Sequence, residues 1–298
     1  MKHHYVPQFL LRRWTDDRGR LFSFSVRNGA LVCSRRTPKS TGYESGLYAI
    51  VANVFGLSED HIEKKLFGPI DNAAAVALEK IENHEALAGD DHVAWTFFLS
   101  SLRIRQPDTL EFLRTKGMAL LVAKLAEIDA ANPPPGDQTT ADWYEQHFPG
   151  GLEAASLASW LPRMIALDTV TDAFAGLDWR IREFGPDMPG LLLSDMPLHS
   201  ENPLADPDFF ITLPIAPNRL FMGTRSPETH AVLSQMPAAD LIANVNRTTL
   251  ALSSNRIWAA TRGDSHEFIE ANIDAVGVNV IRFDDLAPWS ENGAIMHS

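Results

Sequence analysis

The first dozen residues concentrate side chains that could carry out chemistry. His3 and His4 are adjacent, and Gln8 follows four residues after His4. An imidazole titrates near neutral pH, so either histidine could act as a general acid or base or bind a metal ion. Neighbours in an extended segment point to opposite faces, so one histidine would enter a site while the other bonds backbone or meets solvent. Both could instead serve only to satisfy buried backbone groups.

The same segment carries enough apolar surface to be held by the body of the protein. Chain ends normally fray unless something ties them down. Six apolar or aromatic residues could do so here: Tyr5, Val6, Phe9, Leu10, Leu11 and Trp14. We therefore expect the N-terminus to be buried and to carry His3 and His4 into an internal polar cleft.

Asp195 is a second candidate, because it follows the apolar run 191–193 and precedes Met196-Pro197. A carboxylate at the end of a strand, held by a proline-stiffened turn, is often displayed where folds place reactive groups. His199, four residues further on, could lie near it. The structural alternative is that the carboxylate bonds the backbone of its own turn.

Arg103 and Arg105 end an apolar segment that predicts a central helix. Cations at a helix C-terminus are favoured by the helix dipole, which is a sufficient structural explanation. A guanidinium also matches phosphate or carboxylate through paired hydrogen bonds. The partner would be a substrate phosphate, or it would be Asp195 or Glu63, which would make the set a structural network.

Glu63 lies on a predicted helix beside two lysines, where a solvated ion pair is the simplest explanation. With a histidine and Asp195 it would complete a nitrogen and oxygen set suited to a divalent metal, which is one candidate cofactor. The compact His-Glu-x-x-His motif is absent. Asn246 lies within a mostly apolar helix, from which it would either reach the same cleft or face water.

The segment 3–12 resembles the opening of an uncharacterised, mainly bacterial family, the domain of unknown function numbered 4238. The family carries a glutamate in its first long helix, an Arg-x-Pro-like patch, a Ser-Asp-x-Pro turn and a late asparagine. Those positions are matched by Glu63, 103–107, 194–197 and Asn246. The resemblance covers nearly the whole chain, implies a shared site and supplies no established activity.

The arginine patch departs from the family pattern. Gln106 stands between Arg105 and Pro107, so Arg103 and Arg105 are both candidates.

Composition limits the classes of protein. The 298 residues are 45% hydrophobic, enough for a large core. The formal net charge of −12 disfavours non-specific binding to nucleic acid or anionic membranes, although an acidic protein can concentrate arginine on one face. Cys33 is the only cysteine, which excludes an intrachain disulfide and a cysteine-based zinc site. With no secretion signal or membrane-length apolar run, we expect a soluble cytoplasmic protein.

Hydrophobic periodicity predicts an α+β fold with an N-terminal β-hairpin, a helical middle and a mixed C-terminal sheet. Strands are predicted at 21–26 and 30–33 around Asn28-Gly29, and at 47–51, 179–184, 191–194, 209–213, 220–222, 256–260 and 278–283. Helices are predicted at 7–14, 58–81 with a break at Gly68-Pro69, 90–106, 108–131, 141–148, 152–176, 238–252 and 266–273. We expect a single domain over 1–298, with sub-regions 1–57, 58–176 and 177–298.

These candidates support a hydrolase acting on a phosphodiester or another phosphorylated substrate. His3, His4, Glu63 and Asp195 would be catalytic, and Gln8, Arg103, Arg105 and Asn246 would bind substrate. The alternatives are a non-catalytic module that binds or senses a small anionic ligand or nucleotide, and a protein-interaction domain. Phosphate loops, dinucleotide fingerprints and serine-nucleophile elbows are absent from the sequence. The sequence leaves open the substrate, the metal, nucleic-acid binding and the oligomeric state.

Overall fold

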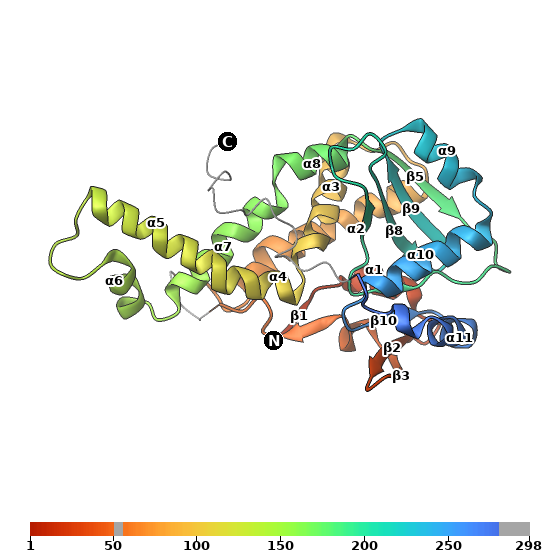
Figure 1. Cartoon of the computed structure of the whole chain (residues 1–298), viewed down its shortest axis with the longest axis horizontal. Helices are drawn as coiled ribbons and strands as arrows, with labels where there is room; N and C mark the ends of the chain where they lie inside the picture. Colours follow the sequence, from red (N-terminus) through yellow and green to blue (C-terminus); the bar gives the residue numbers. More distant parts are fainter. Residues whose placement is uncertain (51–55, 280–298) are drawn as a thin grey trace.

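The structure of the protein is a computed structural model that describes residues 1–50 and 56–279. Its strands are β1 Lys2–His4, β2 Leu21–Arg27, β3 Ala30–Arg36, β4 Tyr43–Ser45, β5 Asp178–Glu183, β6 Leu193–Ser194, β7 His199–Glu201, β8 Phe210–Ala216, β9 Arg219–Thr224 and β10 Ile257–Ala259. Its α-helices are α1 Gln8–Leu11, α2 Gly68–Glu82, α3 Gly89–Ile104, α4 Pro107–Phe112, α5 Met118–Ala131, α6 Thr140–His147, α7 Gly151–Ile165, α8 Asp168–Ala175, α9 Pro227–Gln235, α10 Ala238–Leu252 and α11 Gly263–Ala271. The expected α+β class is confirmed (Figure 1).

β2 and β3 form the hairpin that the turn residues predict. Asn28 has a φ of 51° and Gly29 a φ of 75°, the left-handed pair that a tight hairpin turn requires. β2 also pairs with β10, and β10 pairs with β6, which gives the order β3-β2-β10-β6. One sheet therefore joins strands from both ends of the described chain.

The start of the chain is fixed by strand pairing. β1 pairs antiparallel with β4, and His3 lies opposite Glu44. The backbone N–H groups of Tyr5 and Val6 both donate to the carbonyl oxygen of Gly42, at 3.0 and 3.2 Å. His3 and Val6 are fully buried. The expected burial of the N-terminus is therefore observed.

The third strand lies earlier than the sequence predicts. We expected it at 47–51, whereas the strand is β4 at 43–45. Gly46, with a φ of 71°, turns the chain away directly after β4. Residues 47–50 are mostly buried without pairing as a strand, so their apolar pattern reflects core packing. Residue 51 lies outside the described residues.

The C-terminal sheet has the order β5-β9-β8-β7 and is covered by helices on both faces. We expected a mixed sheet here, and each of its three strand pairs is antiparallel. On one face β8 and β9 pack against α2, α3 and α8, and on the other β9 packs against α10. Four side chains of α3 are 1% exposed or less, namely Trp95, Phe98, Leu99 and Leu102. This confirms α3 as the central helix.

The helical middle follows the predicted spans with local differences. Gly68-Pro69 is not a break: a π-helical turn at 63–67, in which the N–H of Gly68 donates to the carbonyl of Glu63, runs directly into α2. The predicted helix at 152–176 is divided into α7 and α8. α5 and α6 project from the body in Figure 1. Most of the predicted strand at 278–283 lies outside the described residues.

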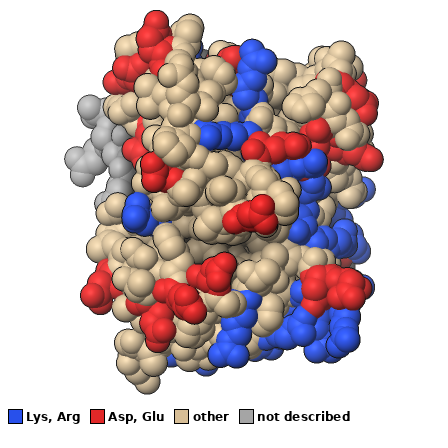
Figure 2. All heavy atoms as spheres, turned by 90° about the vertical axis from the view of Figure 1, so that its right-hand side faces the viewer, with Lys and Arg blue, Asp and Glu red and all other residues tan. Residues whose placement is uncertain are grey.

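Figure 2 shows the face of the molecule that lies on the right-hand side of Figure 1. Lys and Arg side chains gather toward the right and lower edges of this face.

Candidate functional site

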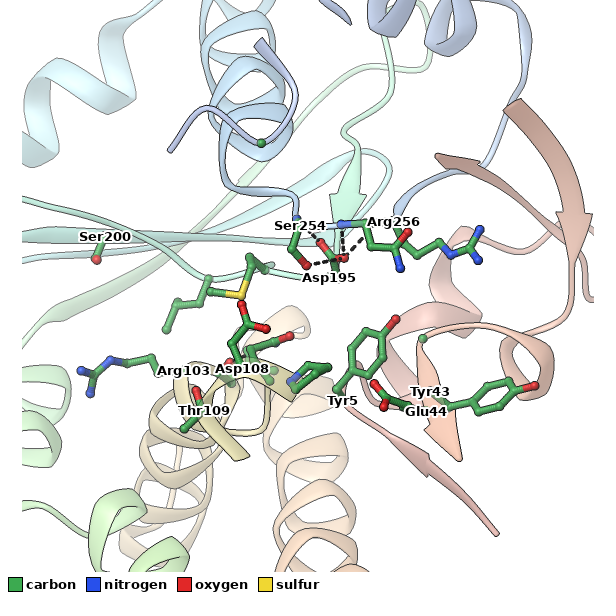
Figure 3. A pocket seen from close by; sticks show the side chains of 18 of the residues that line it. Tyr5, Tyr43, Glu44, Arg103, Asp108, Thr109, Asp195, Ser200, Ser254 and Arg256 are labelled. Atoms are coloured by element: carbon green, nitrogen blue, oxygen red, sulfur yellow. Dashed lines mark hydrogen bonds between the residues drawn. The ribbon is translucent and has the colours of Figure 1, made fainter. Parts of the chain in front are cut away.

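A cavity of about 1300 Å³ lies where segments far apart in the sequence meet. One wall is the junction of α3 and α4, which contributes Arg103. The facing wall is made by Asp195, after β6, and by residues 254–256, after α10. Tyr5 and the strand β4 complete the lining. Figure 3 shows Arg103 on one side and Asp195 with Ser254 and Arg256 on the other, with Tyr5 beside them.

Asp195 holds the turn that follows α10. Its Oδ1 accepts hydrogen bonds from Ser253 Oγ at 3.2 Å and from the backbone N–H of Ser254 at 2.9 Å. Its Oδ2 accepts from Ser254 Oγ at 3.0 Å and from the N–H groups of Asn255 and Arg256 at 2.7 and 2.8 Å. A carboxylate offers about four acceptor sites, so five donors saturate it. The interpretation as a turn-binding aspartate thus has direct geometric support, although the bonded turn is 58 or more residues away.

The protonation of Asp195 follows from this environment. Burial raises the pKa of Asp195 above its ordinary value, and the hydrogen bonds from residues 254–256 oppose that rise. All five contacts are donors to the carboxylate, which favours its ionised form.

Arg103 is a cation of the cavity wall that pairs with no carboxylate among the described residues. Its Cζ lies 6.0 Å from the ring centre of Phe174, and burial lowers the pKa of Arg103 below its ordinary value. Arg36 and Arg256 line the same cavity, again without an ion pair in the part of the chain that is described. A partly buried cation without an anion is unfavourable, so the wall around Arg103 is suited to an anionic group.

Arg105 has a different environment from Arg103. It is fully buried, and its two terminal nitrogens donate to the carboxylate of Asp71 at 3.2 and 2.9 Å. Nη2 also donates to Ser101 Oγ at 2.6 Å, and Cζ lies 4.7 Å from the ring centre of Phe67. Its partner is therefore the carboxylate of Asp71, and not one of the three alternatives that the sequence left open, namely Asp195, Glu63 or a substrate phosphate.

His3 and Glu63 contribute to the buried region around Arg105. Tyr48 connects His3 to Arg105: the backbone N–H of Tyr48 donates to His3 Nδ1 at 2.7 Å, and its hydroxyl donates to the backbone carbonyl of Arg105 at 2.9 Å. The buried atoms His3 Nε2, Glu63 Oε2 and Arg105 Nε have no hydrogen-bond partner among the described residues. Burial, reinforced by Asp71, raises the pKa of Glu63 to about 7.

Glu63 makes the stability of the protein depend on pH near neutrality. Its folded pKa of about 7 lies above the ordinary value of 4.5. The folded protein holds the Glu63 proton more tightly than the unfolded chain does. The resulting gain in the free energy of unfolding is therefore complete below pH 4.5 and is lost as the pH rises through 7. The shift corresponds to about 3 kcal/mol at most. We expect Glu63→Gln to flatten the fall in the urea unfolding midpoint between about pH 5 and 8.

Glu59→Gln is the matched control for this measurement, because Glu59 is exposed four residues earlier. It should retain the wild-type slope. An unchanged slope in Glu63→Gln would show that Glu63 does not keep its proton in the folded state.

Three other candidates make their contacts outside the cavity, His4 and Asn246 with backbone groups and Gln8 with the His4 ring. His4 Nε2 lies 3.3 Å from the carbonyl oxygen of Pro38, and Gln8 Nε2 lies 3.5 Å from His4 Nδ1. Burial lowers the pKa of both His3 and His4, which favours neutral imidazoles. Asn246 accepts from the N–H of Leu192 at 2.8 Å and donates to the carbonyl of Gly190 at 3.1 Å. The three side chains fix the N-terminal segment and the approach to β6.

His199 is buried between two threonine hydroxyls and does not bond Asp195. Its ring nitrogens lie 3.4 Å from Thr212 Oγ1 and 3.3 Å from Thr249 Oγ1. Burial lowers the pKa of His199 to about 4, so the ring is neutral near pH 7.

Of the eight candidate residues, the structure brings Arg103 and Asp195 to the cavity. His3, Glu63 and Arg105 belong to the separate buried region, and His4, Gln8 and Asn246 make the contacts described above. The expectation of one shared cleft therefore needs correction. Residues two apart on a helix face different directions, which is why Arg103 reaches the cavity and Arg105 does not.

The cavity also contains residues that the sequence did not suggest. Tyr5 was expected only as an apolar anchor, yet it lines the cavity, and burial raises the pKa of its hydroxyl. Arg36, Tyr43 and Arg256 line it as well. Each comes from a strand end or an adjoining turn, and none belongs to a recognisable motif. The sequence signal that could have indicated these residues is their place beside predicted strands. Arg36 follows the second strand of the hairpin, and Arg256 stands at the start of a predicted strand.

Within residues 1–50 and 56–279, no three His, Cys, Asp or Glu side chains gather in a way that could hold a metal ion. Nor does any helix in these ranges combine the length and the apolar character needed to cross a membrane.

A family model described as "Protein of unknown function (DUF4238)" matches residues 2–263 of this chain. The chain belongs to this family. Comparison with curated proteins and with solved structures gives no match. Three of the segments that carry the DUF4238 resemblance line the cavity, through Tyr5, Arg103 with Pro107, and Asp195 with Met196. In this DUF4238 protein three of the five recognisable segments thus converge on one concave surface.

Proposed function

We propose that the cavity binds a phosphorylated ligand and that the protein hydrolyses a phosphoester bond in it. The observation that carries this proposal is Arg103, a partly buried cation on the cavity wall without a carboxylate partner among the described residues. A phosphate would neutralise it through charge-assisted hydrogen bonds. Arg36 and Arg256 supply further positive charge to the same cavity.

Hydrolysis requires a base that can activate water. Asp195 is saturated by its five donors, but Asp108 and Glu44 line the cavity and form no ion pair in the described part of the chain. Asp108 lies on the same wall as Arg103 (Figure 3). In this proposal Arg103 holds the phosphoryl oxygens, and Asp108 accepts the proton of the water whose oxygen bonds to phosphorus. The P–O bond to the leaving group breaks, and the leaving oxygen keeps the electron pair and takes a proton from solvent.

The second candidate function is binding or sensing of the same ligand without turnover. It is favoured by the neutral, backbone-bonded state of His3 and His4, which leaves the cavity without either histidine. Phosphate release from bis(p-nitrophenyl) phosphate and from nucleotides separates the two functions. Binding without release, in the presence of added divalent metals, would favour sensing. We further propose a cytoplasmic setting, because Cys33 is the only cysteine.

Arg103→Gln is expected to weaken the binding of inorganic pyrophosphate and of adenosine monophosphate by about tenfold or more, because one charge-assisted contact contributes about 1.5–3 kcal/mol. Isothermal titration calorimetry measures this loss. Arg163→Gln, which removes an exposed arginine of α7, should bind both probes as the wild type does. Equal affinities for Arg103→Gln and the wild type, or no binding to the wild type, would contradict the proposal.

A further inference from the structure

Positive charge is concentrated at the start of this acidic chain. Residues 1–40 contain nine Lys and Arg against two Asp, a net charge of +7, whereas the whole chain has a net charge of −12. The remaining residues 41–298 therefore carry −19. Such a division creates a local positive field that the overall charge conceals.

The structure places several of these cations around the base of the β2–β3 hairpin. Arg35 pairs with Asp16, and Arg13 pairs with Glu82. Four exposed cations at this end of the hairpin form no ion pair with a described carboxylate, and we call them the basic rim: Arg18, Arg20, Arg36 and Lys39.

The basic rim is continuous with the cavity. Arg36 lines the cavity, and so does Ser40, the neighbour of Lys39. In the hairpin register Arg36 lies opposite Leu21, so Arg20 lies at the same end of the hairpin, because paired strands are about 5 Å apart.

The turn that carries Arg18 and Arg20 is fixed in place. Both N–H groups donate to Asp16 Oδ1, at 3.0 and 2.9 Å, and the carboxylate of Asp16 also bonds Arg35 on β3. The cations outside the cavity are thus mounted on an ordered turn.

Figure 2 shows several Lys and Arg side chains at the height where Figure 1 draws the hairpin. Acidic side chains lie among them at the lower right of Figure 2, and others lie at the left and upper edges of that face. A small phosphorylated ligand would contact only the cations of the cavity. A row of unpaired cations extending outside it is the arrangement that binds successive phosphates of a polyanion.

We propose that the basic rim binds the backbone of single-stranded nucleic acid and leads one end of the strand into the cavity. This inference rests on the proposed function, since the cavity would receive the terminal phosphate or the scissile phosphodiester. A strand fits better than a duplex, because a single strand can thread into a cavity of about 1300 Å³.

Fluorescence anisotropy with labelled DNA and RNA strands of about 20 nucleotides tests the proposal, with duplex DNA in a third arm. We expect the wild type to bind a single strand, with an affinity that falls as salt rises. Arg18→Glu/Arg20→Glu should weaken this binding about tenfold or more at low salt, because two phosphate contacts become repulsive. The DNA and RNA arms identify which strand is preferred.

The control is Lys116→Glu/Arg163→Glu, which changes the net charge equally at exposed, unpaired positions on the π-helical turn before α5 and on α7. It should keep strand affinity within about twofold of the wild type. An equal loss in both double variants, no strand binding by the wild type, or tighter binding to duplex than to single strands would overturn the inference. Arg18→Glu/Arg20→Glu should bind pyrophosphate as the wild type does, whereas Arg103→Gln should bind it about tenfold or more weakly. Strand binding therefore tests the proposal for the basic rim, and pyrophosphate binding separately tests the proposal for the cavity.

Discussion

Asp195→Asn is expected to lower the free energy of unfolding by about 3–5 kcal/mol. The asparagine side chain keeps one acceptor oxygen and replaces the other by an NH2 group. The Oδ2 position accepts the backbone N–H groups of Asn255 and Arg256, and the Oδ1 position accepts that of Ser254. In either orientation of the amide, donors then face donors inside the protein. The loss includes both the missing bonds and the N–H groups left unsatisfied.

The urea unfolding midpoint and the melting temperature measure this effect. Asp108→Asn is the matched control, because Asp108 also lines the cavity but is exposed and makes no described side-chain bond. Its stability should stay within about 0.5 kcal/mol of the wild type. If Asp195→Asn melted like the wild type and lost only activity, Asp195 would be catalytic and the turn would not depend on it.

Arg105→Met is expected to lower the free energy of unfolding by about 3–5 kcal/mol, because it leaves the Asp71 carboxylate buried without its cation. Asp71 accepts two hydrogen bonds from Arg105, and burial raises the pKa of Asp71 while Arg105 opposes that rise. The same substitution removes the hydrogen bond of 2.6 Å that Arg105 Nη2 donates to Ser101 Oγ. We expect a lower melting temperature and, between pH 5 and 8, a stability that falls further as the lone carboxyl ionises.

Arg103→Met is the natural control, two residues earlier on the same helix. Its guanidinium has no described carboxylate partner, so its removal should change stability by less than about 1 kcal/mol while it weakens anion binding. Arg105→Met/Asp71→Leu should recover much of the lost stability, because a buried ion pair can be replaced by apolar residues. A double variant no more stable than Arg105→Met would show that the ion pair is not the source of the loss.

Local signals predicted the elements that local interactions determine. The hairpin was predicted because Asn28-Gly29 supplies the left-handed turn, and α3 because its apolar residues leave no polar face. β4 was misplaced because its partner, β1, lies about forty residues earlier, and the choice between 43–45 and 47–51 is made by that long-range pairing.

The candidate site was predicted in part for the same reason. The end of a strand and the end of a helix were sufficient to single out Asp195 and Arg103, and both line the cavity. The sequence could not separate Arg103 from Arg105, since only the packing of α2 against α3 shows that Asp71 faces Arg105. Tyr5, Arg36 and Arg256 come from segments far apart in sequence, so their meeting depends on the complete fold.

The strand order β3-β2-β10-β6 has a consequence for how the protein is made. β2 is paired on one side by its own hairpin, but its other neighbour, β10, lies more than two hundred residues later. While the ribosome is still synthesising the helical middle, β2 therefore presents an open hydrogen-bonding edge to other nascent chains. The pairing of β2 is therefore completed only after the C-terminal segment has left the ribosome, and the formation of this sheet is a late, long-range step of folding.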